Sequence, residues 1–360
     1  MIRRPTLYLD SQALRHNARV ARFYARNRRM FAAIKADGYG HGMLRVAQLL
    51  SGYCDGFAVA TVGEAEQLRT AGINVPILVI QGALYPEELA TACALQLDLV
   101  FHDQSQIALL KHSQPAQGSI RAWLKVNTGM NRLGLDPAQI PQACAQLRRT
   151  PYVQPNIGLM SHFARADQPE LNTTKEQCAV FQSVAAGRGY QHSLSNSAAL
   201  LNGCVNEHWV RPGIMLYGGN PFVSGQISDW GLKPVMQLTT RLIAAHTVKA
   251  GARIGYGGRF QAREDMRVGV AAIGYGDGYP RHAVDGTPIA INGQRTRLIG
   301  RVSMDLITLD LTNIHAEVGA VVECWGPTID INHVADRAST ISYELMCKIS
   351  TPLRQNAQII

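Results

Sequence analysis

Short apolar runs recur through the first part of the chain and alternate with stretches of helical periodicity. Eight of these runs have the length and composition of buried strands: Met30–Ile34, Gly56–Ala60, Pro76–Ile80, Leu97–Phe101, Ile120–Val126, Asn156–Ser161, His192–Leu194 and Trp209–Leu216. Helical segments between them include Val62–Ala71, Pro86–Ala94, Pro137–Arg148 and Lys175–Ala186. Eight strand–helix repeats in roughly 220 residues predict a TIM-like (β/α)8 barrel, with an open doubly wound sheet as the alternative.

The pattern changes near Pro221–Pro234, a stretch that contains Gly, Ser and Pro. Beyond it, strand-like runs follow one another at short spacing: Gln237–Val248, Met266–Ile273, Thr287–Ile291, Thr296–Asp310 and Val318–Trp325. Asp285-Gly286 and Asn292-Gly293 are turn signals of the kind that joins hairpins. We therefore expect an α/β barrel over residues 1–230 and a mainly β domain over residues 231–360, in which Ile331–Arg337 forms a final helix.

The composition excludes intrinsic disorder, because 46% of the 360 residues are hydrophobic and only 17% are charged. The formal charge of +9 raises the question of a nucleic-acid partner. Part of the excess falls at helical spacing, at Arg15, Arg19, Arg22, Arg26 and Arg29. No aromatic residues interleave with these arginines as a base-stacking surface would require, so we interpret them as a solvated helix face and expect no nucleic-acid partner.

The seven cysteines are scattered and never form a C-x-x-C pair. This spacing predicts neither a metal site nor a disulfide framework, which favours a reducing compartment. The first residues have no apolar signal region, and no run approaches the ~18 apolar residues of a membrane span. We expect a cytoplasmic protein without a membrane partner.

Polar groups lie at or just beyond the ends of five of the predicted barrel strands: Lys35, Lys125 with Arg132, His162, Asn196 with Ser197, and Arg211 with Gly213. In a (β/α)8 barrel the carboxyl ends of the strands meet at one mouth, where active sites lie. The sequence therefore predicts that these groups converge there.

Lys35 ends an apolar strand, and burial there would disfavour its charged form, as an imine-forming lysine requires. The loops after strands 7 and 8 are the usual phosphate site of this fold, and here they contain Asn196-Ser197 and Gly213-Ile214. The alternatives are a surface lysine and ordinary helix caps and turns. An imine-forming lysine and a phosphate site on one barrel together suggest pyridoxal 5′-phosphate.

Eight motifs carry a resemblance to a known family, in family order: AIKADGYGHG, LKVNTGMNRLG, LMSHF, SNSA, VRPGI-x-LYG, IGYGGRF, GYGDGYPR and RVSMD. The chain resembles the pyridoxal-phosphate-dependent bacterial alanine racemases over nearly its whole length. The resemblance implies an isomerase that interconverts L- and D-alanine, for peptidoglycan or for alanine catabolism. It also implies a homodimer whose active sites are shared between subunits. A racemase of the same fold with another or broader substrate range, such as serine, is the alternative.

The resemblance implies two bases on opposite faces of the cofactor. Lys35 would form the aldimine and act on one face, and Tyr256 would act on the other face from the partner subunit. Racemisation removes the Cα proton from one face and returns a proton to the other, a task that suits two bases. On residue type alone, Tyr256 could equally be an ordinary turn aromatic.

The resemblance also assigns the surrounding residues. Arg211 would bind the pyridine nitrogen, where related decarboxylases place an acid, and His162 would pack beside the ring. The other cofactor-binding positions are Tyr39, Asn196, Ser197, Gly213, Ile214 and Tyr343. The substrate would meet Arg132 and, from the partner, Tyr275, Met304 and Asp305. Lys125 matches a lysine that is carbamylated in some members. A cofactor carrier built on the barrel alone would need neither Tyr256 nor a β domain.

Overall fold

The computed structural model describes residues 5–112, 117–203 and 207–360. Eight parallel strands close a barrel: β2 (Arg29–Ala33), β3 (Gly56–Val59), β4 (Ile77–Val79), β5 (Asp98–Phe101), β6 (Arg121–Lys125), β7 (Gly158–Met160), β8 (Gln191–Ser193) and β9 (Trp209–Val210). β9 pairs with β2, which completes the ring. The predicted (β/α)8 class is therefore confirmed, and the open sheet is excluded.

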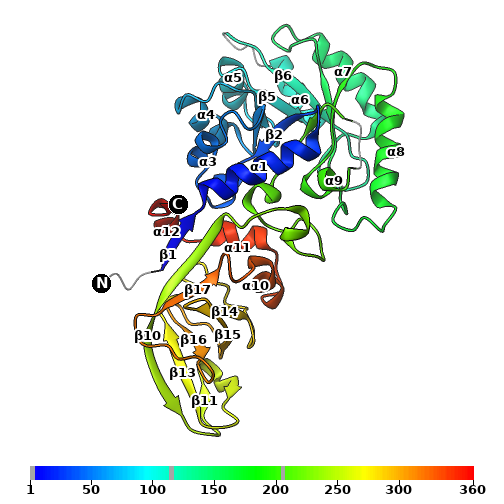
Figure 1. The fold of residues 1–360 in the computed structure, drawn as a ribbon. Helices are drawn as coiled ribbons and strands as arrows, with labels where there is room; N and C mark the ends of the chain where they lie inside the picture. The colour runs from blue at the N-terminus through cyan, green and yellow to red at the C-terminus, as the bar shows by residue number, and fades with distance from the viewer. Residues whose placement is uncertain (1–4, 113–116, 204–206) are drawn as a thin grey trace.

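Helices surround the barrel (Figure 1). They are α1 (Ser11–Ala25), α2 (Lys35–Tyr39), α3 (Met43–Leu49), α4 (Val62–Thr70), α5 (Pro86–Ala94), α6 (Gln104–His112), α7 (Ile140–Arg148), α8 (Thr173–Ala185) and α9 (Ser197–Leu201). Side-chain caps fix the N-termini of several helices, because the first N–H groups of a helix have no backbone acceptor within the helix. The Asp10 carboxylate accepts from Ala13 N at 2.8 Å, and Thr61 and Glu64 form a capping box on α4. The four predicted helical segments are present, with Pro137–Gln139 as a separate 3-10 turn.

Two predicted elements are shorter than expected. The arginine-bearing helix α1 ends at Ala25, since Arg26 adopts a left-handed φ of 54° and Arg29 already begins β2. The predicted strand Trp209–Leu216 is extended only over Trp209–Val210. Pro212 has no N–H to offer a ladder, and the 3-10 helix Ile214–Tyr217 follows at once.

Aromatic rings fill the interior of the barrel. Phe31 on β2 stacks on Trp209 with ring centroids 3.9 Å apart, and it meets Trp123 on β6 edge-on at 6.2 Å. All three side chains are fully buried. Gly56 and Gly158 leave room for these rings, because a Cβ at Gly56 would lie 2.9 Å from Phe31, and one at Gly158 would overlap Trp123. The barrel is thus a packed core rather than a channel.

The C-terminal part is a curled, mainly antiparallel sheet. Its long strand β10 (Met236–Val248) runs beside β13 (Met266–Ala271) and β17 (Val321–Trp325). The remaining strands are β14 (Pro288–Ile291), β15 (Gln294–Ile299) and β16 (Ile307–Asp310), and a separate hairpin pairs β11 (Arg253–Ile254) with β12 (Phe260–Gln261). Asn292-Gly293 forms the predicted tight turn, with φ of 48° and 81°. The run Thr296–Asp310, predicted as continuous, is two strands broken near Gly300, where φ is 74°.

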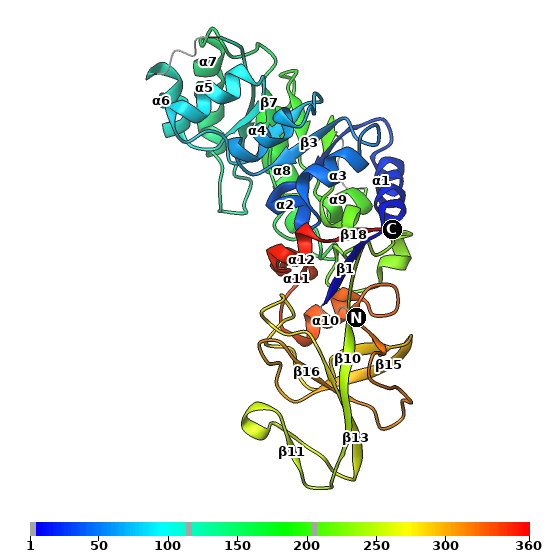
Figure 2. The same cartoon turned by 90° about the vertical axis from the view of Figure 1, so that its left-hand side faces the viewer.

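Two short strands near the ends of the chain join this sheet beside the barrel (Figure 1). β1 (Thr6–Leu9) pairs antiparallel with β10, and β18 (Gln358–Ile359) pairs parallel with β1. Between the two domains lie α10 (Ile331–Arg337), which is the predicted helix, α11 (Ser342–Lys348) and α12 (Thr351–Gln355), as Figure 2 shows. The main hydrophobic core runs without interruption through both domains. Across the three described ranges, every helix is too short or too polar to cross a bilayer.

We predict that Gly158→Ala destabilises the barrel, because the new methyl group would collide with the buried Trp123 ring. Overpacking of this kind costs about 1–3 kcal/mol, which a lower thermal or urea midpoint would report. Gly63→Ala is the matched control, since Gly63 lies in α4 with open space around its Cβ position. Alanine there should hold or raise the midpoint. An unchanged midpoint in Gly158→Ala would contradict the tight interior packing.

Candidate functional site

A cavity of about 370 Å³ opens at the carboxyl ends of the barrel strands. It is lined by eleven of the residues singled out from the sequence: Lys35, Tyr39, Lys125, Arg132, His162, Asn196, Ser197, Arg211, Gly213, Ile214 and Tyr343. Ten of them belong to the barrel, and Tyr343 comes from α11. The order of the barrel strands and the packing of α11 thus bring together residues that lie as far apart in the sequence as Lys35 and Tyr343.

The charges of this cavity are strongly one-sided. Four cationic side chains line it, Lys35, Lys125, Arg132 and Arg211, and no lining residue is acidic. Like charges that converge in a partly buried space favour an anionic ligand. The cavity therefore suits a molecule with phosphate or carboxylate groups.

A left-handed turn directly after β2 positions Lys35 and Tyr39. Ala36, Asp37, Gly38 and Tyr39 have φ values of 53° to 62°, which non-glycine residues adopt only at a cost. Bonds to residues outside the turn hold it: the Asp37 carboxylate accepts from Met43 N at 2.9 Å and pairs with Arg354 at 3.0 Å. The Glu64 carboxylate accepts from Ala36 N at 2.9 Å. Such strain held by surrounding bonds is typical of a functional segment.

The Lys35 side chain is exposed in the single chain. The expectation that a barrel strand alone would desolvate this lysine is therefore wrong. The left-handed turn begins immediately after Lys35, whose side chain lines the cavity and is exposed at its mouth.

Arg211 is buried and held by four acceptors at the ends of β7 and β8. Its guanidinium donates to Ser161 O at 2.6 Å, to Leu194 O at 3.0 Å and to the Ser193 hydroxyl, and it lies 3.4 Å from His162 Nδ1. Burial lowers the pKa of Arg211 to about 10, although Glu207 opposes the shift. A guanidinium held in this way keeps a fixed orientation toward the cavity and offers only donors.

The phosphate-site loops come together where Tyr39 meets the turn after β9. The Ser197 hydroxyl accepts from Gly213 N at 2.9 Å, and a Cβ at Gly213 would come within 2.6 Å of the Tyr39 hydroxyl oxygen. A side chain at position 213 would therefore require the buried Tyr39 ring to move. The side chain of Asn196 caps α9 by accepting from Ala199 N at 3.1 Å. The alternative interpretation of Asn196 as a helix cap is therefore confirmed.

Two further cavity residues, Lys125 and His162, have lowered pKa values. Burial, followed by the nearby Arg211, Arg132 and Lys35, lowers the pKa of Lys125 to about 8. Burial and the same cationic surroundings hold the pKa of His162 well below its usual range. His162 is thus a neutral ring beside the cavity, and Lys125 is poised to lose its proton near neutral pH.

Apart from Tyr343, the predicted site residues of the C-terminal domain are not in this cavity. Tyr256, Tyr275 and Met304 have 69%, 40% and 56% of their surface exposed, and Asp305 is exposed as well. Tyr275, Met304 and Asp305 share one surface loop system, in which Gly276 N donates to Met304 O at 2.9 Å. Tyr256 directly follows the β11 hairpin strand, which lies at the end of the β domain away from the barrel in both views (Figures 1 and 2).

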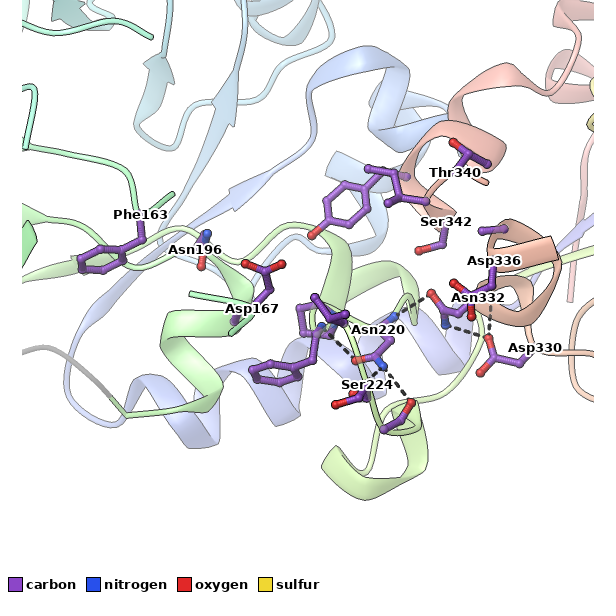
Figure 3. Close-up of a pocket in the computed structure, with 18 of the residues that line it drawn as sticks. Phe163, Asp167, Asn196, Asn220, Ser224, Asp330, Asn332, Asp336, Thr340 and Ser342 are labelled. Carbon is purple, nitrogen blue, oxygen red and sulfur yellow. Dashed lines mark hydrogen bonds between the residues drawn. The ribbon is translucent and has the colours of Figure 1, made fainter. Parts of the chain in front are cut away.

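A second cavity of about 690 Å³ adjoins the first and shares His162, Asn196 and Tyr343 with it. Figure 3 shows Asp167 and Asn196 on one side, facing the segment of Asp330, Asp336 and Ser342 on the other. Hydrogen bonds tie Asn332 to Asn220 at 3.3 Å and to Asp330 at 2.8 Å. This neighbouring space, lined by acids, contrasts with the cationic cavity.

Sequence reasoning missed several residues of the site. Ser161 and Cys347 line the cavity, and Glu207 bonds the backbone next to it. Ser161 stands inside the motif LMSHF and could have been identified as a strand end. Glu207 and Cys347 are isolated in the sequence, and only the folded chain brings them near the cavity.

Comparison with known proteins gives a consistent result. The family profile "Alanine racemase, N-terminal domain" matches residues 9–221, and "Alanine racemase, C-terminal domain" matches residues 235–356. The alanine racemase of Nitrosococcus oceani is 47% identical over 348 residues, covering 96% of this chain and 97% of the relative. The alanine racemase of Pseudomonas fluorescens is 45% identical over 343 residues, covering 95% of each chain.

Among solved structures, the biosynthetic alanine racemase from Pseudomonas aeruginosa superposes with a TM-score of 0.95 at 38% identity, covering 100% of this chain and 99% of that one. The alanine racemase from Acinetobacter baumannii gives a TM-score of 0.92 at 36% identity and covers 100% of both chains. Sequence and fold match alanine racemases over nearly the whole length of the chain. The chain belongs to the alanine racemase family.

Proposed function

We propose that the cationic cavity interconverts L- and D-alanine with pyridoxal 5′-phosphate, the cofactor of this family. The observation that carries the proposal is the composition of the cavity. Two lysines, two arginines, a neutral histidine and the seat at Gly213 converge in a space with no acidic lining residue among those that the structure describes. The bound cofactor would supply an electron-withdrawing ring that makes the Cα proton of an attached amino acid acidic.

The residues present fit this cofactor. Lys35 offers an amine at the mouth for bonding the aldehyde carbon, and Arg211 offers fixed donors for the ring nitrogen. The hydroxyls of Tyr39, Ser197 and Tyr343 surround the seat at Gly213-Ile214, where they would hold the phosphate. Because Arg211 has no proton to release under ordinary conditions, the ring nitrogen beside it would remain unprotonated.

Two bases would move the proton. Lys35 Nζ would take or return it on one face of the substrate, and the Tyr256 hydroxyl would serve the other face. The exposed position of Tyr256 on the far β domain supports its service to a second copy of the chain. We therefore propose a homodimer with composite sites, in which Lys35 acts with the partner subunit's Tyr256.

The other assignments follow from the same arrangement. Arg132, on the loop after β6, would bind the substrate carboxylate. Tyr275, Met304 and Asp305 would line the access to the partner's site, since they share one exposed loop system. We propose the functional division at residues 1–230 and 231–360, and a cytoplasmic enzyme that supplies D-alanine for peptidoglycan or serves alanine catabolism.

The direct test of the activity is chiral chromatography of a panel of L-amino acids incubated with the purified protein. D-alanine should form fastest, and Lys35→Ala should abolish its formation. Faster racemisation of serine or a basic amino acid would overturn the assignment to alanine.

We predict that two inactive variants restore activity when mixed. Lys35→Ala and Tyr256→Phe homodimers should each be nearly inactive. After subunit exchange in equal amounts, half of the dimers are mixed, and each has one intact site. Specific activity should then reach about a quarter of the wild-type value.

Lys35→Ala mixed with Arg132→Ala is the matched control, because both residues line the same chain's cavity. Every site of that mixed dimer keeps one defect, so activity should stay at the level of the parents. Native mass spectrometry would verify exchange in both mixtures. If exchanged Lys35→Ala and Tyr256→Phe dimers remain inactive, Tyr256 does not act across subunits.

We predict that carbon dioxide adds to the Lys125 amine to form a carbamate, with loss of a proton. The neutral amine is the reactive form, and the pKa of Lys125 is lowered to about 8 by burial and by the surrounding cations. A carbamate would give this cavity the acidic group it lacks. At fixed carbon dioxide pressure, carbamate should rise as pH increases through about 8 and fall as the amine is protonated below it.

Carbon-13 NMR with labelled carbon dioxide would detect the carbamate. The signal should vanish in Lys125→Ala and persist in Lys249→Ala, which removes an exposed lysine paired with Asp265 at 2.7 Å. A signal that survives in Lys125→Ala would contradict the assignment.

A further inference from the structure

Glu207 is a buried carboxylate that the mechanism above does not use. Only 5% of its surface is exposed, and it lies just before β9. Its Oε2 atom accepts from two successive backbone N–H groups, Leu194 N and Ser195 N, the latter at 3.0 Å. Burial raises the pKa of this carboxyl, while the two N–H bonds and the charge of Arg211 act in the opposite direction. A carboxylate in such a place costs free energy unless its bonds serve the fold or the site.

The backbone turn that Glu207 holds is shared by the two halves of the cofactor site. Leu194 O accepts from the Arg211 guanidinium at 3.0 Å, and Ser195 O accepts from Arg211 N at 2.9 Å. One residue further on, Asn196 caps α9, and Ser197 accepts from Gly213 N. A shift of this turn would therefore move both Arg211 and the phosphate seat.

Charge gives a second reason for a carboxylate here. Arg211 has no salt bridge to an acid within the described ranges, and Glu207 is the acidic group whose field acts on it. None of the residues that line the cavity carries a negative charge. Glu207 thus offsets a buried cation from behind the site, out of contact with the cavity.

We propose that Glu207 is a positioning residue for the cofactor: its carboxylate fixes the Leu194–Ser197 turn and thereby the phosphate seat. The inference rests on the proposed function, because the seat is assigned to the cofactor phosphate. Glu207 itself touches neither cofactor nor substrate. Its effect passes through the backbone N–H groups of Leu194 and Ser195 to the hydroxyl of Ser197.

The test compares two ligands on the full-length protein freed of cofactor: pyridoxal 5′-phosphate and pyridoxal, which lacks the phosphate. Equilibrium dialysis gives a Kd for each, and the ratio of the two measures the contribution of the seat. Wild-type protein should prefer the phosphorylated ligand strongly. In Glu207→Ala this preference should fall at least about tenfold, as expected when two buried N–H groups lose their acceptor.

Glu207→Gln separates geometry from charge. Its amide oxygen can accept both N–H groups as Oε2 does, so the preference should return to near the wild-type ratio while the thermal midpoint drops because Arg211 loses its compensating charge. Asp98→Asn is the control: Asp98 is also buried and pairs with Arg121, but at the opposite end of the barrel. That variant should lose stability without any change in the ratio.

An unchanged ratio in Glu207→Ala, or a loss in Glu207→Gln as large as that in Glu207→Ala, would overturn the proposal. Should Glu207→Ala fail to fold, Glu207→Asp takes its place, because the shorter side chain keeps the charge but cannot reach the turn. A wild-type protein without preference for the phosphorylated ligand would instead refute the proposed phosphate seat itself. The two failures are therefore distinguishable.

Discussion

The site depends on the burial of one guanidinium. Arg211 donates to Ser161 O and Leu194 O, so a single side chain joins the ends of β7 and β8 to the turn that follows β9. Its charge also contributes to the electrostatics of the mouth: burial, followed by Arg211, lowers the pKa of both Lys125 and His162. A cavity organised around such a cation favours anionic ligands, and a ring nitrogen placed beside Arg211 would stay unprotonated.

The attachment of the chain's end segments bears on the proposed composite site. β1 and β18, near the two ends of the chain, both belong to the sheet that contains β10 of the β domain. Tyr256 is exposed just beyond β11 of that domain, and Lys35 is exposed at the barrel mouth. A second copy of the chain would both cover the lysine and supply the missing base.

Local pattern was sufficient for most elements. Buried parallel strands are continuous apolar runs, so all eight barrel strands were predictable, and Asn292-Gly293 indicated its hairpin. The strand predicted over Trp209–Leu216 was too long, because Pro212 ends an otherwise apolar run. β1 and β18 gave no usable signal, since such short strands are defined by partners distant in the sequence.

Some residues of the candidate site were predictable from the sequence, and others were not. Residues at strand ends, such as Lys35 and His162, could be inferred from position, whereas Tyr256 rested on motif resemblance. The role of Glu207 could not be inferred from the sequence. It precedes an ordinary strand, and its two hydrogen bonds are made to backbone N–H groups that follow the neighbouring strand β8. The exposure of Lys35 was also unpredictable, because it depends on the left-handed turn that follows β2.

In the proposed reaction, two bases on opposite faces of the substrate exchange the Cα proton. The most direct measurement is racemisation of ordinary L-alanine in deuterium oxide, with the first D-alanine formed analysed by proton NMR. Because the base that removes the proton differs from the base that returns one, the early D-alanine should carry deuterium at Cα. Early D-alanine that mainly retains the original proton would show that one base serves both faces and would contradict the account.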